Sequence, residues 1–306
     1  MTQSTWPELV LEEWQDTLAT VHMWTQIVGK IRMETTPLVN HWWNVPLYVS
    51  ARGLTTSPMP YGDRIFEIEF DFIDHKLLIA CNDGATASLD LRPQSVADFY
   101  QELMDALHGL GIEVKIWTTP VEVPGPSTAV REAIPFEQDE SHKSYDADYV
   151  NRFWRALISI DEVFKDFRTR FLGKVSPVHF WWGSFDHAVT RFSGRPAPPR
   201  EGADKITAEG YSHENISHGF WPGGNGNQAA FYAYSAPEPA GLGDAKVKPA
   251  AAFYSKEMSE FFLPYDAVRK ASSPEDALMD FLQSTYEAAA DLAKWDRKAL
   301  EREAVQ

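Results

Sequence analysis

Two short segments with the same rare pattern constrain the fold of this chain most strongly. They are NHWW, from Asn40 to Trp43, and HFWW, from His179 to Trp182. Side chains alternate between the two faces of a β-strand, so a strand with either sequence carries aromatic rings on both faces. A sheet that is wet on one side would alternate apolar and polar residues instead. We therefore expect both segments to be strands that are covered twice, by helices and by the other half of the chain.

The hydrophobic periodicity predicts a helix at each end of the first half, with strands between them. The capping-box residues Thr5 and Glu8 begin a helix over about 6–33, and Ser95 caps a second helix that ends near Gly109. Turn signals such as the Asn-Asp-Gly sequence at 82–84 separate the later strands, which indicates antiparallel hairpins. The expected strands cover residues 40–43, 45–52, 65–72, 76–81, 86–91 and 113–117.

The rest of the chain shows the same order of elements. Residues 118–145 contain four prolines and little apolar periodicity, so we expect a long connector there. A stripe of apolar residues from Val150 to Phe171 predicts a helix, and Ser272 begins a final helix that runs to about Trp295. The expected strands of this half cover residues 178–182, 185–192, 216–221, 229–234 and 250–255.

These patterns predict an α+β protein with two similar halves, each a mainly antiparallel sheet with flanking helices. An offset of 139 residues also places four residues of the first half on identical residues of the second. They are Val39, Trp42, Trp43 and Arg52, which align with Val178, Trp181, Trp182 and Arg191. We therefore predict an internal duplication, with halves at 1–118 and 146–306 and a connector at 119–145.

The composition excludes several classes of protein. The 306 residues include 28 Lys and Arg and 44 Asp and Glu, and the net charge of −16 argues against nucleic acid or an anionic membrane as partner. Hydrophobic residues make up 44% of the chain, which is enough for a large core, yet no apolar run is long enough to span a membrane. The single cysteine, Cys81, permits no internal disulfide, and the acidic N-terminus is unlike a signal peptide. We expect a cytoplasmic protein.

Sequence motifs that would fix a mechanism are missing. The chain has no P-loop, no His-Glu-x-x-His zinc motif, no Gly-x-Ser-x-Gly elbow and no calcium loop. The glycine-rich segment 222–226 lacks the Lys-Ser/Thr pair of a P-loop, so we interpret it as a turn. A mechanism therefore has to come from polar residues that are scattered along the chain.

Four residues are candidates for catalysis: His179, Asp186, His213 and Glu214. His213 and Glu214 are neighbours, so they form a general acid–base pair only if a bend in the strand turns both toward one pocket. A divalent transition metal is a further option, because dispersed His, Asp and Glu side chains can converge on one ion in the fold. The alternative for each histidine is a hydrogen-bonded structural residue.

A second set of residues is expected to bind a ligand. His22 and Gln26 lie one turn apart in an apolar helical segment, so they form either the floor of a pocket or a pair that faces solvent. Arg52 and Arg191 would hold a carboxylate or phosphate, which belongs either to a ligand or to an internal ion pair. The aromatic residues wall a cavity or fill a core between the halves. The full set is His22, Gln26, His41, Trp42, Arg52, Trp181, Arg191 and Trp221, with Arg195 and Glu238 as further polar candidates.

Seven sequence blocks resemble a bacterial family of uncharacterised proteins that is known only as a domain of unknown function. The blocks are HMWTQIVGK (22–30), NHWW (40–43), SPVHFWWGSFD (176–186), TRFSG (190–194), YSHE (211–214), GFWPG (219–223) and PEP (237–239). The resemblance covers nearly the whole chain and implies family membership without an activity. It implies that the signature blocks contain His22, His41, His179, Asp186, Arg191, His213 and Glu214, whereas His187 looks incidental.

Together, the aromatic segments and the polar candidates predict an enzyme that acts on a small polar or carboxylated molecule in an aromatic-walled pocket. Its chemistry would be acid–base catalysis by His and Glu, or a metal-assisted reaction. The alternative is a non-catalytic module that binds a small molecule or a peptide. The sequence leaves both functions open.

Overall fold

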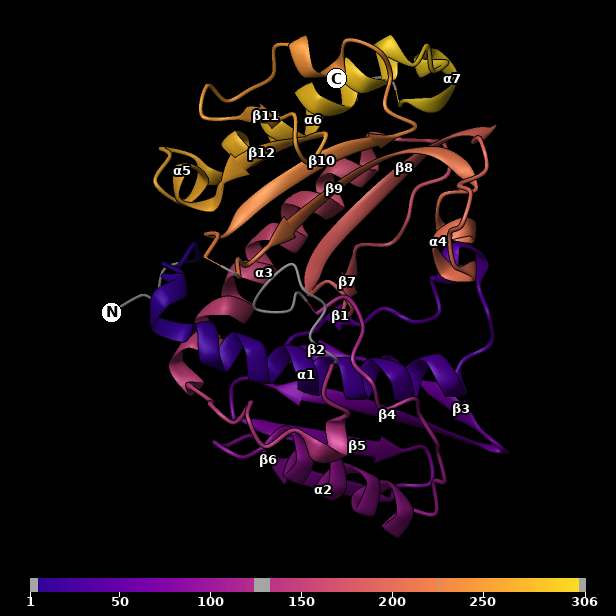
Figure 1. The fold of residues 1–306 in the computed structure, drawn as a ribbon, viewed down its shortest axis with the longest axis vertical. Coiled ribbons are helices and arrows are strands. Elements are labelled where there is room, and N and C mark those ends of the chain that lie inside the picture. The colour runs from indigo at the N-terminus through magenta and orange to yellow at the C-terminus, as the bar shows by residue number, and fades with distance from the viewer. Residues whose placement is uncertain (1–4, 124–132, 225, 303–306) are drawn as a thin grey trace.

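The computed structural model describes residues 5–123, 133–224 and 226–302. Within these ranges the chain forms two antiparallel sheets of six strands each, with helices packed against them (Figure 1). The predicted α+β class, with a sheet in each half, is confirmed. None of the helices in these ranges combines the length and the hydropathy that a transmembrane span needs.

The first half contains a long helix, a six-stranded sheet and a second helix. Helix α1 (Leu11–Thr35) is followed by the short 3₁₀ helix η1 (Asn40–Trp42). The strands are β1 (Tyr48–Val49), β2 (Gly53–Thr55), β3 (Met59–Tyr61), β4 (Arg64–Asp71), β5 (Lys76–Cys81) and β6 (Thr86–Asp90). Their order in the sheet is β1-β2-β4-β5-β6, with β3 paired to β4. Helix α2 (Val96–Gly109) follows, and Ser95 caps it as predicted, by accepting a hydrogen bond from the Asp98 amide at 3.0 Å.

The second half begins with another long helix, α3 (Ala147–Thr169), which follows the 3₁₀ turn η2 (Phe136–Gln138). The strands are β7 (His179–Trp181), β8 (Asp186–Pro196), β9 (His213–Trp221), β10 (Ala230–Ala236), β11 (Phe253–Ser255) and β12 (Glu260–Pro264), in the order β11-β12-β10-β9-β8-β7. The shorter helical elements are α4 (Lys205–Gly210), η3 (Leu242–Asp244), α5 (Tyr265–Arg269) and α7 (Arg297–Leu300). Helix α6 (Pro274–Leu292) is the predicted C-terminal helix, and its cap is Ser273 rather than Ser272.

Helix α1 joins the cores of the two halves and crosses the molecule between the two sheets (Figure 1). Its Trp24 ring stacks on Phe99 of α2 with 4.6 Å between centroids, and its Trp14 ring contacts Phe153 of α3 at 5.4 Å. The buried apolar residues of both halves form one continuous cluster. The domain boundaries at 118 and 146 remain a prediction, since the cores on either side of them are continuous.

The middle of α1 is buried on every side. All thirteen residues from Thr20 to Arg32 are buried, although three of them, His22, Gln26 and Lys30, are polar residues spaced four apart. Such a spacing places them in one row along the helix, and each buried polar group then needs a partner. The partners are backbone groups of distant segments, described with the site below. This row therefore attaches other parts of the chain to α1.

Two further contacts join the halves. The backbone groups of Leu47 and Phe180 exchange two hydrogen bonds of 2.9 Å, which link the ends of the two sheets. The Trp182 indole donates to the Val45 carbonyl at 2.9 Å and lies so close to α1 that a Cβ at Gly29 would come within 2.3 Å of its ring. Gly29 is thus required by a close approach rather than by a turn.

The predicted strand at 40–43 is wrong. Residues 40–42 form the 3₁₀ helix η1, and His41 and Trp42 both have a φ of 59°, in the left-handed region. Contacts with α4 hold this conformation, because Glu209 Oε1 accepts a hydrogen bond from the His41 amide at 3.0 Å. The equivalent segment of the second half is strand β7. Residues 113–117 are also not a strand, and β2, β3, β12 and α4 were not predicted.

The two arginines that the offset aligned lie in different environments. Arg52 precedes β2, its side chain is 40% exposed, and it pairs with Asp71 at 2.6 Å and Asp74 at 2.7 Å. Arg191 lies within β8 and is fully buried. The internal duplication therefore remains a prediction that rests on the order of elements.

The contact between Gly29 and Trp182 predicts a stability effect. We expect Gly29→Ala to lower the free energy of unfolding by about 1–3 kcal/mol, because the added methyl overpacks the contact between α1 and Trp182, the residue after β7. The matched control is Gly109→Ala at the end of α2, where a Cβ meets nothing within 4 Å. That change should be neutral or stabilise by up to about 1 kcal/mol. Urea unfolding of both variants measures the difference, and equal effects would contradict the packing described here.

Candidate functional site

The residues of the second sheet divide into two faces. One face packs against α3 and α6 and belongs to the core. Here His187 Nε2 contacts Asp161 of α3 at 3.2 Å, and His218 Nε2 contacts Thr285 of α6 at 3.0 Å. Both histidines are fully buried, and burial lowers the pKa of His218 to about 3. These two histidines are structural residues of the core.

Arg191 lies on the same core face and contacts no carboxylate among the described residues. Its guanidinium donates to the Phe167 carbonyl and lies over three rings, 3.4 Å from the centroid of Phe167, 4.3 Å from that of Tyr286 and 5.0 Å from that of Phe171. Cation–π contacts of this kind stabilise a buried arginine. Burial lowers the pKa of Arg191 to about 9, and interactions with Tyr286 and Glu301 oppose this shift. The ligand-binding role that the sequence left open stays a prediction.

The other face of the sheet turns away from α3 and α6 and carries the polar groups that a site needs. Strand register brings residues of β7, β8, β10 and β12 together on it, since Trp181 pairs with Asp186, and Tyr232 pairs with both Gly219 and Phe262. We call it the tyrosine face, and its members are Trp181, Asp186, Tyr232, Tyr234 and Glu260.

Asp186 is the centre of the tyrosine face. It is 6% exposed, and its carboxylate accepts hydrogen bonds from the Ser184 hydroxyl at 2.5 Å and from the Tyr232 hydroxyl. Tyr232 reaches Asp186 from β10 by lying across β9, the strand between them. Gly219 of β9 makes this crossing possible, because a Cβ there would come within 2.2 Å of the Tyr232 ring. The pair therefore depends on a glycine in the middle of the sheet.

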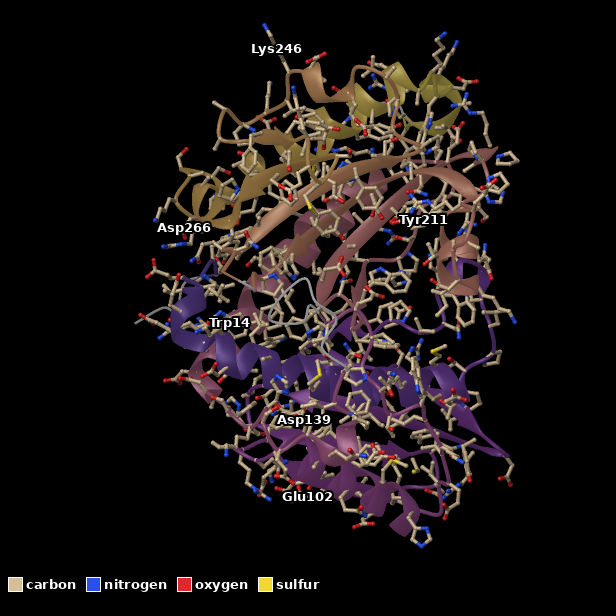
Figure 2. The ribbon with its side chains drawn as sticks, viewed as in Figure 1. Trp14, Glu102, Asp139, Tyr211, Lys246 and Asp266 are labelled. Carbon is tan, nitrogen blue, oxygen red and sulfur yellow. The ribbon has the colours of Figure 1, made fainter. Side chains whose placement is uncertain are left out.

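Further hydroxyl groups extend the polar surface along the strands. The hydroxyls of Tyr211 and Tyr234 lie 2.9 Å apart, and those of Thr190 and Ser217 are also 2.9 Å apart. Tyr211 follows α4 and lies beside the second sheet (Figure 2). The Tyr232 and Tyr234 rings stack with centroids 6.1 Å apart. The face thus offers several hydroxyl groups that can donate or accept hydrogen bonds.

Three carboxyl groups near this face have raised pKa values. Burial raises the pKa of Asp186 above its ordinary value, and hydrogen bonds from Ser184 and Tyr232 oppose the shift. Burial and the nearby Asp186 charge raise the pKa of Glu260 to about 7. Desolvation of its carboxylate and the charges of Asp186 and Asp204 raise the pKa of Glu122, an exposed residue whose carboxylate lies against Gly183. Like charges that lie close together oppose one another's ionisation, and Glu260 can hold a proton near neutral pH.

Four predicted site residues lie in a chain of aromatic contacts that leads to this face. Ring centroids are 5.8 Å apart between His213 and His41, 5.5 Å between His41 and Trp43, 5.9 Å between Trp43 and His179, and 5.3 Å between His179 and Trp181. Trp181 is paired in register with Asp186. The structure therefore brings His41, His179, Trp181 and His213 into one region, next to the predicted catalytic Asp186.

His179 is unsuited to proton transfer with solvent in this conformation. It is 1% exposed, and neither ring nitrogen has a hydrogen-bond partner within the described part of the chain. Burial lowers its pKa to about 3, so the ring is neutral at physiological pH. Trp43, Tyr48 and Trp181 surround it. The His179 ring is therefore buried beneath these aromatic side chains and is not exposed at the tyrosine face.

The predicted pair of His213 and Glu214 does not share a pocket. The two residues begin β9 and point to opposite faces, since His213 contacts His41 whereas Glu214 pairs with Arg195 at 2.6 Å. The bend that the acid–base interpretation required is absent from β9. Each residue therefore has a separate environment.

His22 and Gln26 are not the floor of a pocket. His22 Nε2 donates to the carbonyls of Trp182 and Gly183 at 3.1 and 2.9 Å, which fixes the turn between β7 and β8. Gln26 exchanges two hydrogen bonds with the backbone of Val121, of 2.7 and 2.9 Å. Burial lowers the pKa of His22 to about 4, so it is neutral in the folded protein. Both residues position the backbone around the site.

The remaining predicted residues are not members of the tyrosine face. Arg52 lies directly before β2 of the first sheet, where it pairs with Asp71 and Asp74. Trp42 is half-buried, and its indole nitrogen lacks a partner among the described residues. Trp221 ends β9 on the same side as Gly219, so it borders the tyrosine face. The described residues contain no group of three or more His, Cys, Asp or Glu side chains placed to hold a metal ion.

Sequence reasoning missed Tyr232, Tyr234, Glu260 and Glu122. The two tyrosines could have been found, because they alternate with buried apolar residues in a strand that the sequence did predict. Glu260 begins β12, which was not predicted, and Glu122 lies in the segment that was interpreted as a connector. These two residues come close to Asp186 only through the tertiary structure, so no pattern in the sequence around them could have predicted it.

The raised pKa of Glu260 predicts a pH-dependent effect on stability. Folding favours the protonated form of Glu260. Its contribution to the free energy of unfolding is therefore fully present below pH 4.5 and is lost as the pH rises through about 7. Relative to the wild type, Glu260→Gln should therefore gain at most about 3 kcal/mol of stability between pH 4.5 and pH 8, at about 1.4 kcal/mol per pKa unit. Urea unfolding at both pH values measures this gain. Glu257→Gln, in the exposed turn before β12, is the control, and a similar gain in both variants would contradict the assignment.

Comparison with known proteins places the chain in a family without assigning an activity. No curated protein and no solved structure matches it. The family model described as "Family of unknown function (DUF5996)" matches residues 6–302, which is nearly the whole sequence. The expected membership of an uncharacterised family is confirmed. This chain belongs to the family of unknown function DUF5996.

Proposed function

We propose that the protein is an enzyme that transfers protons to and from a small polar molecule bound against the tyrosine face. The observation that carries this proposal is the group of carboxyls with raised pKa values around the hydrogen-bonded pair of Asp186 and Tyr232. Perturbed carboxyl groups cluster at functional sites, because catalysis needs groups that gain and lose protons near the working pH.

Asp186 and Glu260 have different roles in this proposal. Glu260, with a pKa of about 7, exists in both protonation states at neutral pH, so it can act as general acid or general base. Asp186 is fixed by the hydroxyls of Ser184 and Tyr232 and sets the electrostatic environment of Glu260. Tyr232 can pass a proton between Asp186 and a bound molecule through its hydroxyl group.

The surroundings indicate the kind of substrate. Trp181 and Trp221 are partly exposed and offer ring surfaces, while Thr190, Ser217 and Tyr234 offer hydroxyl groups. Three carboxyl groups would repel an anionic substrate at any pH at which they ionise. We therefore favour a neutral polar or cationic molecule over the carboxylated molecule that the sequence suggested.

A binding module without catalysis is the second candidate. Two observations favour it. Asp186 already has two hydrogen-bond donors, and His179, a predicted catalytic residue, is covered by aromatic rings. In that case the tyrosine face would hold its ligand by hydrogen bonds and ring stacking, with no turnover.

The experiment that tests the proposal is incubation of the purified protein with a complex mixture of small polar metabolites, followed by mass spectrometry. We expect at least one compound to be converted. Asp186→Asn and Tyr232→Phe should each slow its conversion by about 10²–10⁴-fold, the usual contribution of a proton-transferring group. Asp166→Asn on α3 and Tyr100→Phe on α2 make the same chemical changes away from the site and should leave the rate unchanged.

Binding without conversion would support the second candidate. It would appear as a compound that raises the thermal unfolding temperature of the wild type and is recovered unchanged. If Asp186→Asn and Tyr232→Phe convert the compound as fast as the wild type, the tyrosine face is not the active site.

A further inference from the structure

A cavity separate from the tyrosine face lies where β9 and β10 meet the end of α6. Its volume is about 160 Å³. The residues that line it are Glu214, Ser235, Pro237, Glu238, Ala293 and Trp295, together with Pro239. Glu214 and Ser235 project from the core side of the sheet, opposite to His213 and Tyr234, so the sheet itself separates the cavity from the tyrosine face.

Glu214 is held in a fixed position at one side of this cavity. Its Oε2 atom accepts hydrogen bonds from the Ser193 hydroxyl at 2.9 Å and from Arg195 Nε at 2.8 Å. Arg195 in turn donates to the Ala293 carbonyl at 2.7 Å. The charge of Glu214 is therefore matched by an arginine. Its contacts within the described residues all involve Oε2, which leaves Oε1 available to accept a hydrogen bond.

Glu238 at the other side of the cavity has a charge that no cation matches. Its side chain is exposed, and Oε1 accepts a hydrogen bond from the Tyr254 hydroxyl. Among the described residues, Glu238 takes part in no ion pair, in contrast to Glu214. The cavity therefore carries one unbalanced negative charge at a position that reaches the protein surface.

The rest of the lining suits a small organic cation. Trp295 is only 7% exposed, and an indole ring attracts a cation through its π-electrons. The Ser235 hydroxyl already donates to the Pro237 carbonyl at 3.1 Å, so it faces a ligand as an acceptor. Acceptors thus outnumber donors in the lining. A cavity of this size holds a molecule comparable to benzene.

We propose that this cavity binds a small alkylammonium ion, with its N–H groups directed at Glu214 and Glu238 and its carbon atoms against Trp295 and the prolines. Three of the segments that carry the family resemblance meet here. Ser193 belongs to the TRFSG block, Glu214 to YSHE and Glu238 to PEP. The proposal does not depend on the chemistry of the tyrosine face.

The test uses three probes of similar length and different charge: butylammonium, 1-butanol and butyrate. Isothermal titration of the full chain with each probe reports binding directly. We expect butylammonium to bind, and 1-butanol and butyrate to bind at least about tenfold more weakly, because only the cation can pair with Glu238. Equal binding of butylammonium and 1-butanol would overturn the proposal, as would an absence of butylammonium binding.

Two variants locate the binding site. Glu238→Gln should weaken butylammonium binding about tenfold or more, and because Glu238 is exposed, the thermal unfolding temperature should not change. Glu257→Gln is the matched control and should bind as the wild type does. Unchanged affinity in Glu238→Gln would show that the ion binds elsewhere. Asp186→Asn should also bind normally, which separates this result from the outcome for the tyrosine face.

Discussion

The structure depends on one constraint, which is the burial of the middle of a helix on all sides. Helix α1 lies between the two sheets, so the polar residues in its buried middle are shielded from water and must bond to whatever packs against them. His22, Gln26 and Lys30 meet this requirement with backbone groups. Lys30 donates to the carbonyls of Trp117 and Thr119 at 2.9 and 2.5 Å, and burial lowers its pKa to about 8. The row of polar side chains thus fixes two segments that have no regular structure of their own, the turn at 182–183 and residues 117–121.

The candidate site is built on the segments that α1 fixes. His22 holds the turn after Trp182, and β8 begins with Asp186 only four residues later. Gln26 holds Val121, the neighbour of Glu122. On the far side of Asp186, Gly219 lets Tyr232 cross an intervening strand. The turn before Asp186 is thus held in place by His22, and Gly219 leaves room for the Tyr232 ring. Together they explain how the buried Asp186 carboxylate is paired with a tyrosine that lies two strands away.

The sequence predicted the regular elements well wherever periodicity alone decides them. Strand β5 was predicted with its observed bounds, and β4 was predicted within one residue at each end. The segment at 40–43 failed because its conformation is set by a distant contact, the one from Glu209 to the His41 backbone. The same reason limited the prediction of the site. Asp186 was found as a polar residue in an aromatic block, but its partners come from β10, β12 and the connector, which no local pattern brings together.

The proposed function requires that the carboxyl groups around Asp186 interact strongly enough to shift one another's pKa values. Carbon-13 NMR of the labelled side-chain carboxyls tests it without knowledge of the substrate. We predict that Glu260 titrates near pH 7, and that Asp186→Asn lowers its pKa toward the ordinary value by removing a neighbouring charge. Titration of Glu260 near pH 4.5 in the wild type, with no change in the variant, would contradict the claim.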